Sequence, residues 1–381
     1  MSTRGDEGPR NTTQIRSSRD PALVRAGLEA WLADQLPAGA APAVTGLEGT
    51  SANGMSSETL LLDATWTEGG NPRAERLVAR LAPDGADVPV FPAYDLERQF
   101  EVIRLVGERS DVPVPRTWWC EPDAGPIGTA FFVMSRLDGR VPPDVMPYNF
   151  GDSWLYDADP ADQQRLQDAT VDVLARLHAI DVDAGADDAF SFLAFAEPGA
   201  TALRRRLRHT ADWFDWISRD MPRSLLVTRA FAWLDEHFPA DEGPAVVSWG
   251  DSRIGNVMYD GFEPAAVLDW EMAGLGPREL DLSWLAYAHR VFEDIAATYG
   301  MGGMPEFLRI EDVAGAYERI TGDTPRHLEW YGAYAAVQYA IVFLRTGFRS
   351  VHFGEREMPA EVDELIMNRA SLERMLAGAD W

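Results

Sequence analysis

Residues 248–271 read SWGDSRIGNVMYDGFEPAAVLDWE, and this stretch decides the fold. Short apolar runs alternate in it with three polar side chains, Asp251, Asn256 and Asp269. Each of the three stands at the end of a predicted short strand or in a tight loop between two strands. Aspartate and asparagine are common in turns for purely local reasons. Whether these three residues are catalytic or only form turns must therefore be judged from the flanking strands and from the spacing.

The spacing of these polar residues matches a requirement of phosphoryl transfer. A carboxylate must orient the attacking hydroxyl, and hard oxygen ligands must hold Mg²⁺ against the phosphates. Protein kinases meet the requirement with Asp-x4-Asn and a second acidic residue on a nearby turn. Asp251 and Asn256 have that spacing, and Asp269 is placed to be the second acidic residue. The stretch therefore predicts a kinase-like catalytic centre.

The chain changes character near residue 138. Before this point the pattern favours strands, and the predicted elements are strands at 58–66, 76–81 and 129–137, a helix at 94–107 and a loop-like stretch at 46–57. After it the apolar spacing is mostly helical, with predicted helices at 160–180, 201–219, 225–237, 281–298, 311–320, 327–347 and 359–377.

This change predicts an α+β, bilobal, protein-kinase-like fold. We expect a disordered tail at 1–19, because almost no apolar residue occurs there. A small β-rich N-terminal lobe that binds nucleotide is expected at 20–137. A large, mainly helical C-terminal lobe at 138–381 is expected to carry catalysis and acceptor binding.

Charge and cysteine content narrow the partners. The formal net charge is −27, and such a surface repels nucleic acid and anionic membranes. Cys120 is the single cysteine, so no intrachain disulfide can form, and a reducing, cytoplasmic setting fits. The longest mostly apolar stretch, 331–344, is shorter than the roughly 20 residues that a membrane span needs. We expect neither nucleic acid nor a membrane as partner, and the sequence leaves the oligomeric state open.

Four segments resemble the aminoglycoside phosphotransferase and choline-kinase-like superfamily. They are Trp249–Asn256, Val267–Glu271, Gly276–Asp281 and the helix end Leu174–His178. The resemblance is closest to mycobacterial proteins named as aminoglycoside phosphotransferases and to the kinase-like domain joined to some acyl-CoA dehydrogenases. It implies ATP and Mg²⁺ as cofactors, Asp251 as the catalytic base, and Asn256 and Asp269 as magnesium ligands.

The resemblance also implies where the nucleotide binds. A loop within 49–57 is expected to cover the phosphates, and the residues that we expect to take part are Ser51, Asn53, Gly54, Met55 and Ser56. The lysine usual on the following strand is replaced by Arg80, whose guanidinium can hold phosphate through two parallel hydrogen bonds. Met134, Ser135 and Leu137 are expected to belong to the hinge, whose backbone would pair with adenine.

Two departures from the family pattern leave a second function open. Trp249 stands where the family usually has histidine. Gln99 stands, between two glutamates, where an acidic partner of Arg80 is expected. A nucleotide-binding regulatory protein without turnover would suit the missing lysine and the Trp249 replacement. Against it, all three residues that would handle the proton and the metal are present, so we predict an enzyme, a small-molecule kinase with an alcohol group as acceptor.

The acceptor and the choice between ATP and GTP stay open. An aminoglycoside would suit the acidic chain, and hydroxylated acyl compounds are the other class that the resemblance suggests. We expect the acceptor pocket between Asp251 and the helices of 145–220 and 280–350. Its expected lining residues are Tyr148, Asp152, Trp154, Trp213, Trp216, Trp284 and His289.

Overall fold

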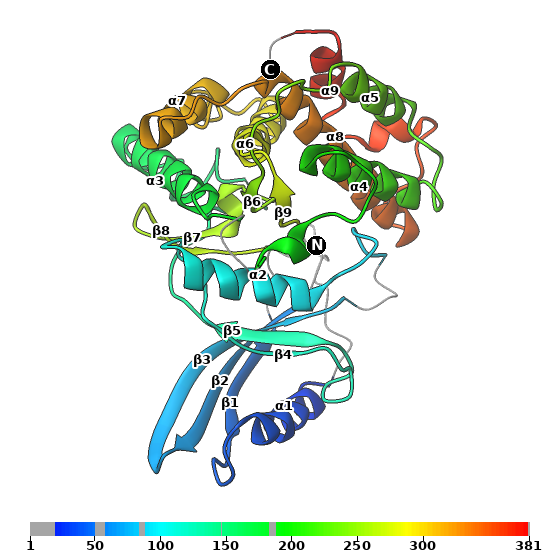
Figure 1. The fold of residues 1–381 in the computed structure, drawn as a ribbon. Helices are drawn as coiled ribbons and strands as arrows, with labels where there is room; N and C mark the ends of the chain where they lie inside the picture. Colours follow the sequence, from blue (N-terminus) through cyan, green and yellow to red (C-terminus); the bar gives the residue numbers. More distant parts are fainter. Residues whose placement is uncertain (1–19, 50–57, 84–87, 146, 183–187, 380–381) are drawn as a thin grey trace, which may run out of the picture.

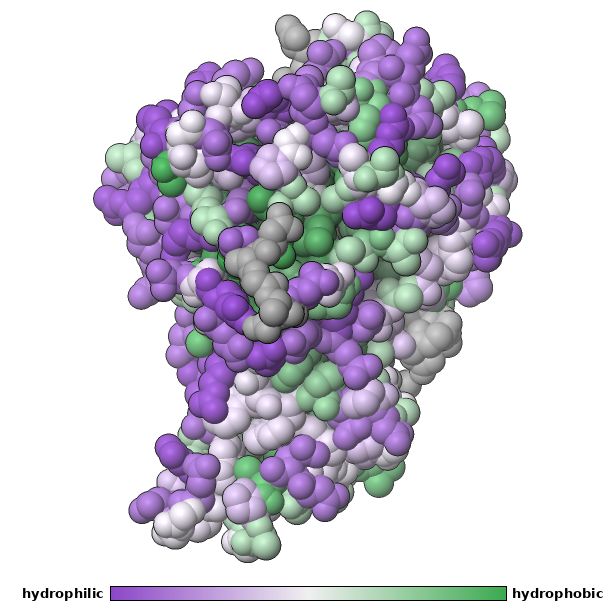
Figure 2. All heavy atoms as spheres, in the orientation of Figure 1, coloured by the Kyte–Doolittle hydropathy of each residue, from purple (hydrophilic) through white to green (hydrophobic). Residues whose placement is uncertain are grey.

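A computed structural model describes residues 20–49, 58–83, 88–145, 147–182 and 188–379. Figure 1 shows a small part built on a sheet below a larger, mainly helical part, which confirms the predicted α+β, bilobal architecture. Hydrophilic residues dominate the face drawn in Figure 2, and hydrophobic ones are gathered mainly around the waist between the two parts. Within the described residues, no helix is both long and apolar enough to cross a membrane.

Helix α1 (Pro21–Gln35) opens the described chain. The side chain of Asp20 accepts a hydrogen bond from the N–H of Ala22 at 2.9 Å, and Pro21 occupies the first helical turn. Both features satisfy or avoid the unpaired N–H groups at a helix start. Its apolar face packs on the sheet through Leu28 and Trp31, which are almost fully buried.

The sheet of the smaller lobe is antiparallel throughout, with strand order β1-β2-β3-β5-β4. Its strands are β1 (Ala43–Gly49), β2 (Glu58–Glu68), β3 (Asn71–Leu81), β4 (Thr117–Glu121) and β5 (Phe131–Ser135). The β2–β3 hairpin turns at Gly69 and Gly70, which both have positive φ, as a tight primed turn requires. Helix α2 (Leu96–Arg109) follows its cap Asp95 and lies between the sheet and the larger lobe (Figure 1).

Two short hairpin-like sheets carry the central stretch of the larger lobe. Strand β6 (Val246–Ser248) pairs with β9 (Gly274–Gly276), and β7 (Val257–Asp260) pairs with β8 (Glu263–Val267). A 3-10 turn, η3 (Ile254–Asn256), joins the first pair to the second. These strands, together with α2 and α3, share one apolar core, so the central stretch is held from both sides.

The helices of the larger lobe surround these strands. They are α3 (Pro160–His178), α4 (Ala202–Ile217), α5 (Leu225–Glu236), α6 (Glu279–Thr298), α7 (Ile310–Thr321), α8 (Leu328–His352) and α9 (Arg369–Leu376), with 3-10 turns η2 (Ser191–Leu193) and η4 (Val362–Leu365). Helices α4, α5, α6, α8 and α9 form a second apolar core. Helix α6 therefore contributes to both cores and lies directly behind the central strands.

Besides their packing, the two lobes are joined by the connecting chain and by hydrogen bonds at several places. After β5 the chain enters the larger lobe, where Arg140 exchanges backbone hydrogen bonds of 2.8 Å with Tyr259 on β7. On the other side, the segment before α2 binds the larger lobe. The carbonyl of Val90 accepts from the indole of Trp213 at 2.9 Å, and that of Pro89 accepts from Arg345 at 2.7 Å.

Several element predictions need correction. Residues 46–49, predicted as loop, belong to β1, whose pairing with β2 shifts in register between Val44 and Gly46. The predicted helix at 359–377 is a 3-10 turn followed by the short α9. Asn368 interrupts it, because its buried amide donates to the carbonyl of Ala336 and the hydroxyl of Tyr287 at 2.9 Å each. The short strands β4 and β9 were not predicted. The tail at 1–19 lies outside the described residues, and the lobe boundary at residue 138 stays a prediction.

Candidate active site

Asp251 and Asn256 lie together in the loop between β6 and β7. The Nδ2 of Asn256 donates to the Asp251 carboxylate Oδ2 at 2.7 Å and to the Asp251 carbonyl at 3.1 Å. The loop turns at Gly250, which has φ +91° and where a Cβ would come within 2.2 Å of the carbonyl oxygen of Met272. Only glycine fits there. The two residues of the predicted Asp-x4-Asn pattern are thus hydrogen-bonded to each other, and the turn at Gly250 leads directly into them.

Asp281, on the first turn of α6, holds this loop from below. Its carboxylate accepts from the hydroxyl of Ser248 and from the N–H groups of Trp249 and Gly250, each at 2.9 Å. His178, at the end of α3, approaches the same carboxylate at 3.0 Å. Burial alone would raise the pKa of Asp281, but these hydrogen bonds, with that of His178 the strongest, keep its pKa below the ordinary value. Asp281 therefore supports the loop that carries Asp251.

Asp269 follows β8 in an unusual backbone conformation, with φ +59°. The indole of Trp249 donates to the carbonyl of Leu268 at 3.0 Å and to that of Asp269 at 3.2 Å. The N–H of Leu268 in turn donates to the carbonyl of Asn256 at 2.9 Å. The residue that replaces the family's histidine therefore ties the loop of Asp251 to the turn of Asp269, as a fully buried side chain.

The oxygens of Asn256 and Asp269 fit the expected magnesium ion. Within the described residues, both hydrogen bonds of the Asn256 side chain use its Nδ2, which leaves its carbonyl oxygen available as a ligand. One carboxylate oxygen of Asp269 takes a hydrogen bond from Arg80, and the other oxygen has no recorded donor within the described residues. No cluster of three His, Cys, Asp or Glu side chains suited to a metal occurs in that part of the chain. Mg²⁺ held jointly with phosphates needs only one or two carboxylates, so the set still suits it.

Arg80, on β3, reaches across from the smaller lobe. Its guanidinium donates to the Asp269 carboxylate at 2.7 Å and lies 3.9 Å from Glu271. On α2, Gln99 is buried and Glu101 pairs with Arg104 at 2.5 Å, so neither provides the usual acidic helix partner. All 34 cationic side chains of the sequence are arginines, so no lysine could replace Arg80 at the phosphates.

Arg253 links Asp251 to a residue that sequence reasoning missed. Its Nε donates to Asp251 Oδ2 at 3.2 Å, and its Nη1 is hydrogen-bonded to Asp144, in the segment that leads into the larger lobe. Burial alone would lower the pKa of Arg253, but the charges of Asp251 and Asp144 outweigh it and hold that pKa well above its ordinary value. Nothing local in the sequence marks Asp144, because the contact joins segments far apart in the chain.

The predicted hinge lies where the chain leaves β5. Met134 and Ser135 end that strand, and the Ser135 hydroxyl accepts from the indole of Trp118 at 2.9 Å. The N–H of Arg136 donates to Arg76 on β3 at 2.8 Å, whereas no backbone acceptor is recorded for the N–H of Leu137 within the described residues. The phosphate-loop prediction falls on Ser51, Asn53, Gly54, Met55 and Ser56, which all lie outside the described residues.

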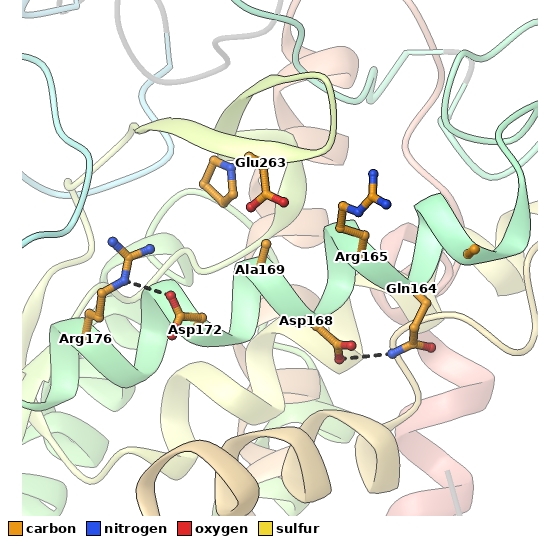
Figure 3. A pocket seen from close by; sticks show the side chains of 9 residues that line it. Gln164, Arg165, Asp168, Ala169, Asp172, Arg176 and Glu263 are labelled. Atoms are coloured by element: carbon orange, nitrogen blue, oxygen red, sulfur yellow. Dashed lines mark hydrogen bonds and ion pairs between the residues drawn. The ribbon is translucent and has the colours of Figure 1, made fainter.

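Most aromatic residues expected to line an acceptor pocket are packed in the cores instead. Tyr148 and His289 are buried and hydrogen-bonded to each other at 2.9 Å, and Trp213 is buried against Val90. Trp284 is the exception, because its indole donates to Asp251 Oδ1 at 2.7 Å. A surface hollow on α3 beside β8, shown in Figure 3, is separate from this site. In it Arg176 forms an ion pair with Asp172, and the amide of Gln164 donates to Asp168.

The comparisons with known proteins agree with this geometry. The model of the phosphotransferase enzyme family matches residues 57–328. The chain belongs to this family. Among curated relatives, the probable acyl-CoA dehydrogenase IBR3 of Arabidopsis thaliana is 28% identical over 274 residues, which cover 67% of this chain and 31% of that protein. Acyl-CoA dehydrogenase family member 11 of Homo sapiens is 26% identical over 209 residues, which cover 54% of this chain and 24% of that protein. The chain thus spans less than a third of these two relatives.

Solved structures of this phosphotransferase's fold include two that cover nearly the whole chain. A putative aminoglycoside phosphotransferase from Ralstonia eutropha superposes with a TM-score of 0.64 at 23% identity, covering 93% of this chain and 99% of the other. Aminoglycoside phosphotransferase APH(4)-Ia, in a complex with ADP and hygromycin B, superposes with a TM-score of 0.53 at 15% identity, with the same two coverages. They show the fold, and with the family match they confirm the resemblance read from the sequence.

Proposed function

We propose that this phosphotransferase moves the γ-phosphoryl group of ATP to a hydroxyl group of a small molecule. The observation that carries the proposal is the Asp251–Asn256 pair, which hydrogen bonds hold beside the turn of Asp269. Asn256 and Asp269 would hold Mg²⁺, which neutralises phosphate charge when it is bound. The adenine would pair with the backbone at Leu137, and Arg80 would turn from Asp269 towards the phosphates.

Asp251 is the catalytic base in this proposal. The acceptor oxygen forms a bond to the γ-phosphorus, the bond from that phosphorus to the bridging oxygen of ADP breaks, and the hydroxyl proton passes to the Asp251 carboxylate. The carboxylate is suited to this role because its donors fix its orientation before the acceptor arrives. Positioning of this kind supplies most of the catalysis in phosphoryl transfer, where the protein does little covalent chemistry.

The acceptor class is the finer part of the proposal. An aminoglycoside is supported by the complex of the structural neighbour with hygromycin B. A hydroxylated acyl compound is supported by the sequence relatives, which are acyl-CoA dehydrogenase family members. Next to Asp251, the carboxylate of Asp144 is already paired with Arg253, so it offers little extra attraction to a polycation. This pairing favours the hydroxyacyl class.

ADP release from Mg·ATP, measured with a panel of aminoglycosides and hydroxyacyl compounds, tests the proposal. Asp251→Ala should lower the transfer rate by roughly a hundredfold or more, because the proton acceptor is gone, while nucleotide binding measured by calorimetry stays intact. Asp260→Ala is the matched control, because it removes an exposed carboxylate on the neighbouring β7, and it should keep the wild-type rate. Near-full turnover in Asp251→Ala would disprove the assignment, and tight Mg·ATP binding without ADP release in the wild type would point to a regulatory protein.

A further inference from the structure

The carboxylate of Asp251 has its two oxygens occupied to different degrees. Oδ2 accepts from Asn256 Nδ2 at 2.7 Å and from Arg253 Nε at 3.2 Å. Oδ1 accepts from Trp284 Nε1 at 2.7 Å. Each carboxylate oxygen offers about two lone-pair sites. Within the described residues, both sites of Oδ2 are therefore filled, and Oδ1 keeps one site for another donor.

Trp284 is held firmly in the position from which it donates. It lies on α6 and is 4% exposed. Its ring stacks on that of Tyr339 from α8, with centroids 4.7 Å apart and an interplanar angle of 27°. Burial, with a further contribution from the charge of Asp251, holds the pKa of Tyr339 well above its ordinary value, which agrees with an aromatic pair close to the carboxylate. The indole cannot leave Oδ1 without breaking this stack.

We propose that Trp284 is a positioning residue for phosphoryl transfer, and that it makes Oδ1 the oxygen that receives the acceptor's proton. Its N–H fixes the carboxylate plane and leaves one directed lone pair on Oδ1 for the acceptor hydroxyl. Oδ2 is unavailable, because Asn256 and Arg253 already occupy it. The inference rests on the proposed function, since it concerns how the base Asp251 is aimed.

This role differs from simple packing. A packing residue would be replaceable by any ring that fills the same space. A positioning donor would not, because a hydrogen bond to a charged group depends on the N–H itself. Trp330 provides the comparison within the same lobe. It is 3% exposed, stacks on Tyr334, and donates to the carbonyl of Leu234 at 3.0 Å, but it does not contact Asp251.

The test compares Trp284→Phe with Trp330→Phe in ADP release from Mg·ATP, with water as the acceptor and then with any compound that the panel identifies. Trp284→Phe should lower kcat by roughly tenfold or more, because a hydrogen bond to a charged group is lost, and should leave KM for ATP unchanged. Trp330→Phe should keep the wild-type kcat. Transfer to the panel compound should fall more than hydrolysis by water in Trp284→Phe, because the aim of Oδ1 matters most for a bulky acceptor.

A second variant removes the N–H without making a cavity. Trp284→3-benzothienylalanine keeps the fused ring and replaces its N–H by sulfur, so it should fold like the wild type and show the same loss of kcat. An unchanged kcat in either Trp284 variant would overturn the inference. If the loss of kcat came together with a lower melting temperature and a raised KM for ATP, the inference would also be overturned, because lost packing would then be the cause. If the wild type releases no ADP while it binds Mg·ATP, the proposed function fails and the inference fails with it.

Discussion

The two lobes contribute to the site in different ways. The half of the site in the larger lobe belongs to a buried hydrogen-bond network. In this network Asp281 contacts both His178 and the backbone of the Asp251 loop. The half in the smaller lobe is represented among the described residues by Arg80, which reaches Asp269 through one short ion pair with both side chains partly accessible. The groups proposed to handle the proton and the metal are thus fixed within one lobe. The cation expected to handle the phosphates depends on a contact between lobes.

This difference has a physical consequence for function. A carboxylate that must receive a proton gains from an orientation set before the substrate arrives. A guanidinium that must release one carboxylate and bind phosphate gains from a contact that phosphate can replace, because phosphate accepts the same charge-assisted hydrogen bonds. Loss of the buried support Asp281 should therefore affect stability and activity together, whereas loss of Arg80 should affect nucleotide binding alone. Three variants test this contrast.

The largest effect is expected for Asp281→Ala. Removing this carboxylate leaves buried donors of Ser248, Trp249 and Gly250 without their acceptor, which should cost about 3–5 kcal/mol in the free energy of unfolding. Urea unfolding followed by tryptophan fluorescence measures this change. ADP release should fall with it, because the loop that carries Asp251 loses its support.

The pH dependence of stability gives a second readout for Asp281. Its folded-state pKa lies below the ordinary value, so its contribution to stability is complete above the unfolded pKa of roughly 4 and is lost as the pH falls below that value. The variant should lack this acid-dependent part. Asp241→Ala is the control, since Asp241, like Asp281, pairs with a histidine, but it lies on the surface and contacts His327 and Arg326 there. Equal stability losses in the two variants would contradict the buried-network account.

An intermediate effect is expected for Arg80→Met, and it should fall on the nucleotide. Loss of a guanidinium that binds phosphate should raise KM for ATP by roughly ten- to a hundredfold, with little change in the midpoint of unfolding. Steady-state kinetics at varied ATP and a thermal melt measure the two quantities. Arg76→Met is the matched control on the same strand, because Arg76 forms an exposed pair with Asp138 at 2.8 Å. If both variants changed KM for ATP by the same factor, the proposal that Arg80 binds the phosphates would be wrong.

The sequence predicted the parts of the site that depend on short-range spacing. Asp251 and Asn256 fall on one loop, and Asp269 falls on the turn after the next hairpin, so their neighbourhood follows from local strand pairing. The place of Asp281 beside this loop also follows from the order along the chain, since it lies in the first turn of the helix after the last of these strands. The lobes followed from the change of periodicity, because strand-rich and helix-rich segments are separated along the chain.

The parts that were missed depend on contacts between distant segments or on backbone alone. Trp284 was expected only as one of several aromatic residues near an acceptor, and its hydrogen bond to Asp251 appears only when α6 packs behind the loop. The pairing of Arg80 with Asp269 joins two lobes and leaves no local pattern. Strand β9, Gly274–Gly276, forms through backbone pairing with β6 and has two glycines, so it has no side-chain alternation to reveal it.

The smallest effect is expected for Trp249→Phe. This variant removes the side-chain hydrogen bonds that join the Asp251 loop to the turn of Asp269. Its indole is the side-chain link from the Asp251 loop to the carbonyls of Leu268 and Asp269. Phenylalanine fills most of the space but cannot donate, so the turn at Asp269, with its positive φ, loses a restraint and the proposed metal ligand becomes less well placed. We expect kcat at saturating Mg²⁺ to fall by about threefold, and the Mg²⁺ concentration for half-maximal rate to rise by a similar factor, as loss of one neutral hydrogen bond of ~1 kcal/mol suggests.

Trp249→His, which restores the family's usual residue, is the informative partner of Trp249→Phe. An imidazole N–H can donate to a carbonyl, so this variant should need less Mg²⁺ than Trp249→Phe even though it leaves a larger cavity. The ordering of the two variants matters more than the size of either effect. If Trp249→His needed more Mg²⁺ than Trp249→Phe, the volume of the indole rather than its hydrogen bonds would be what holds Asp269, and the larger lobe would fix its metal ligand by packing alone.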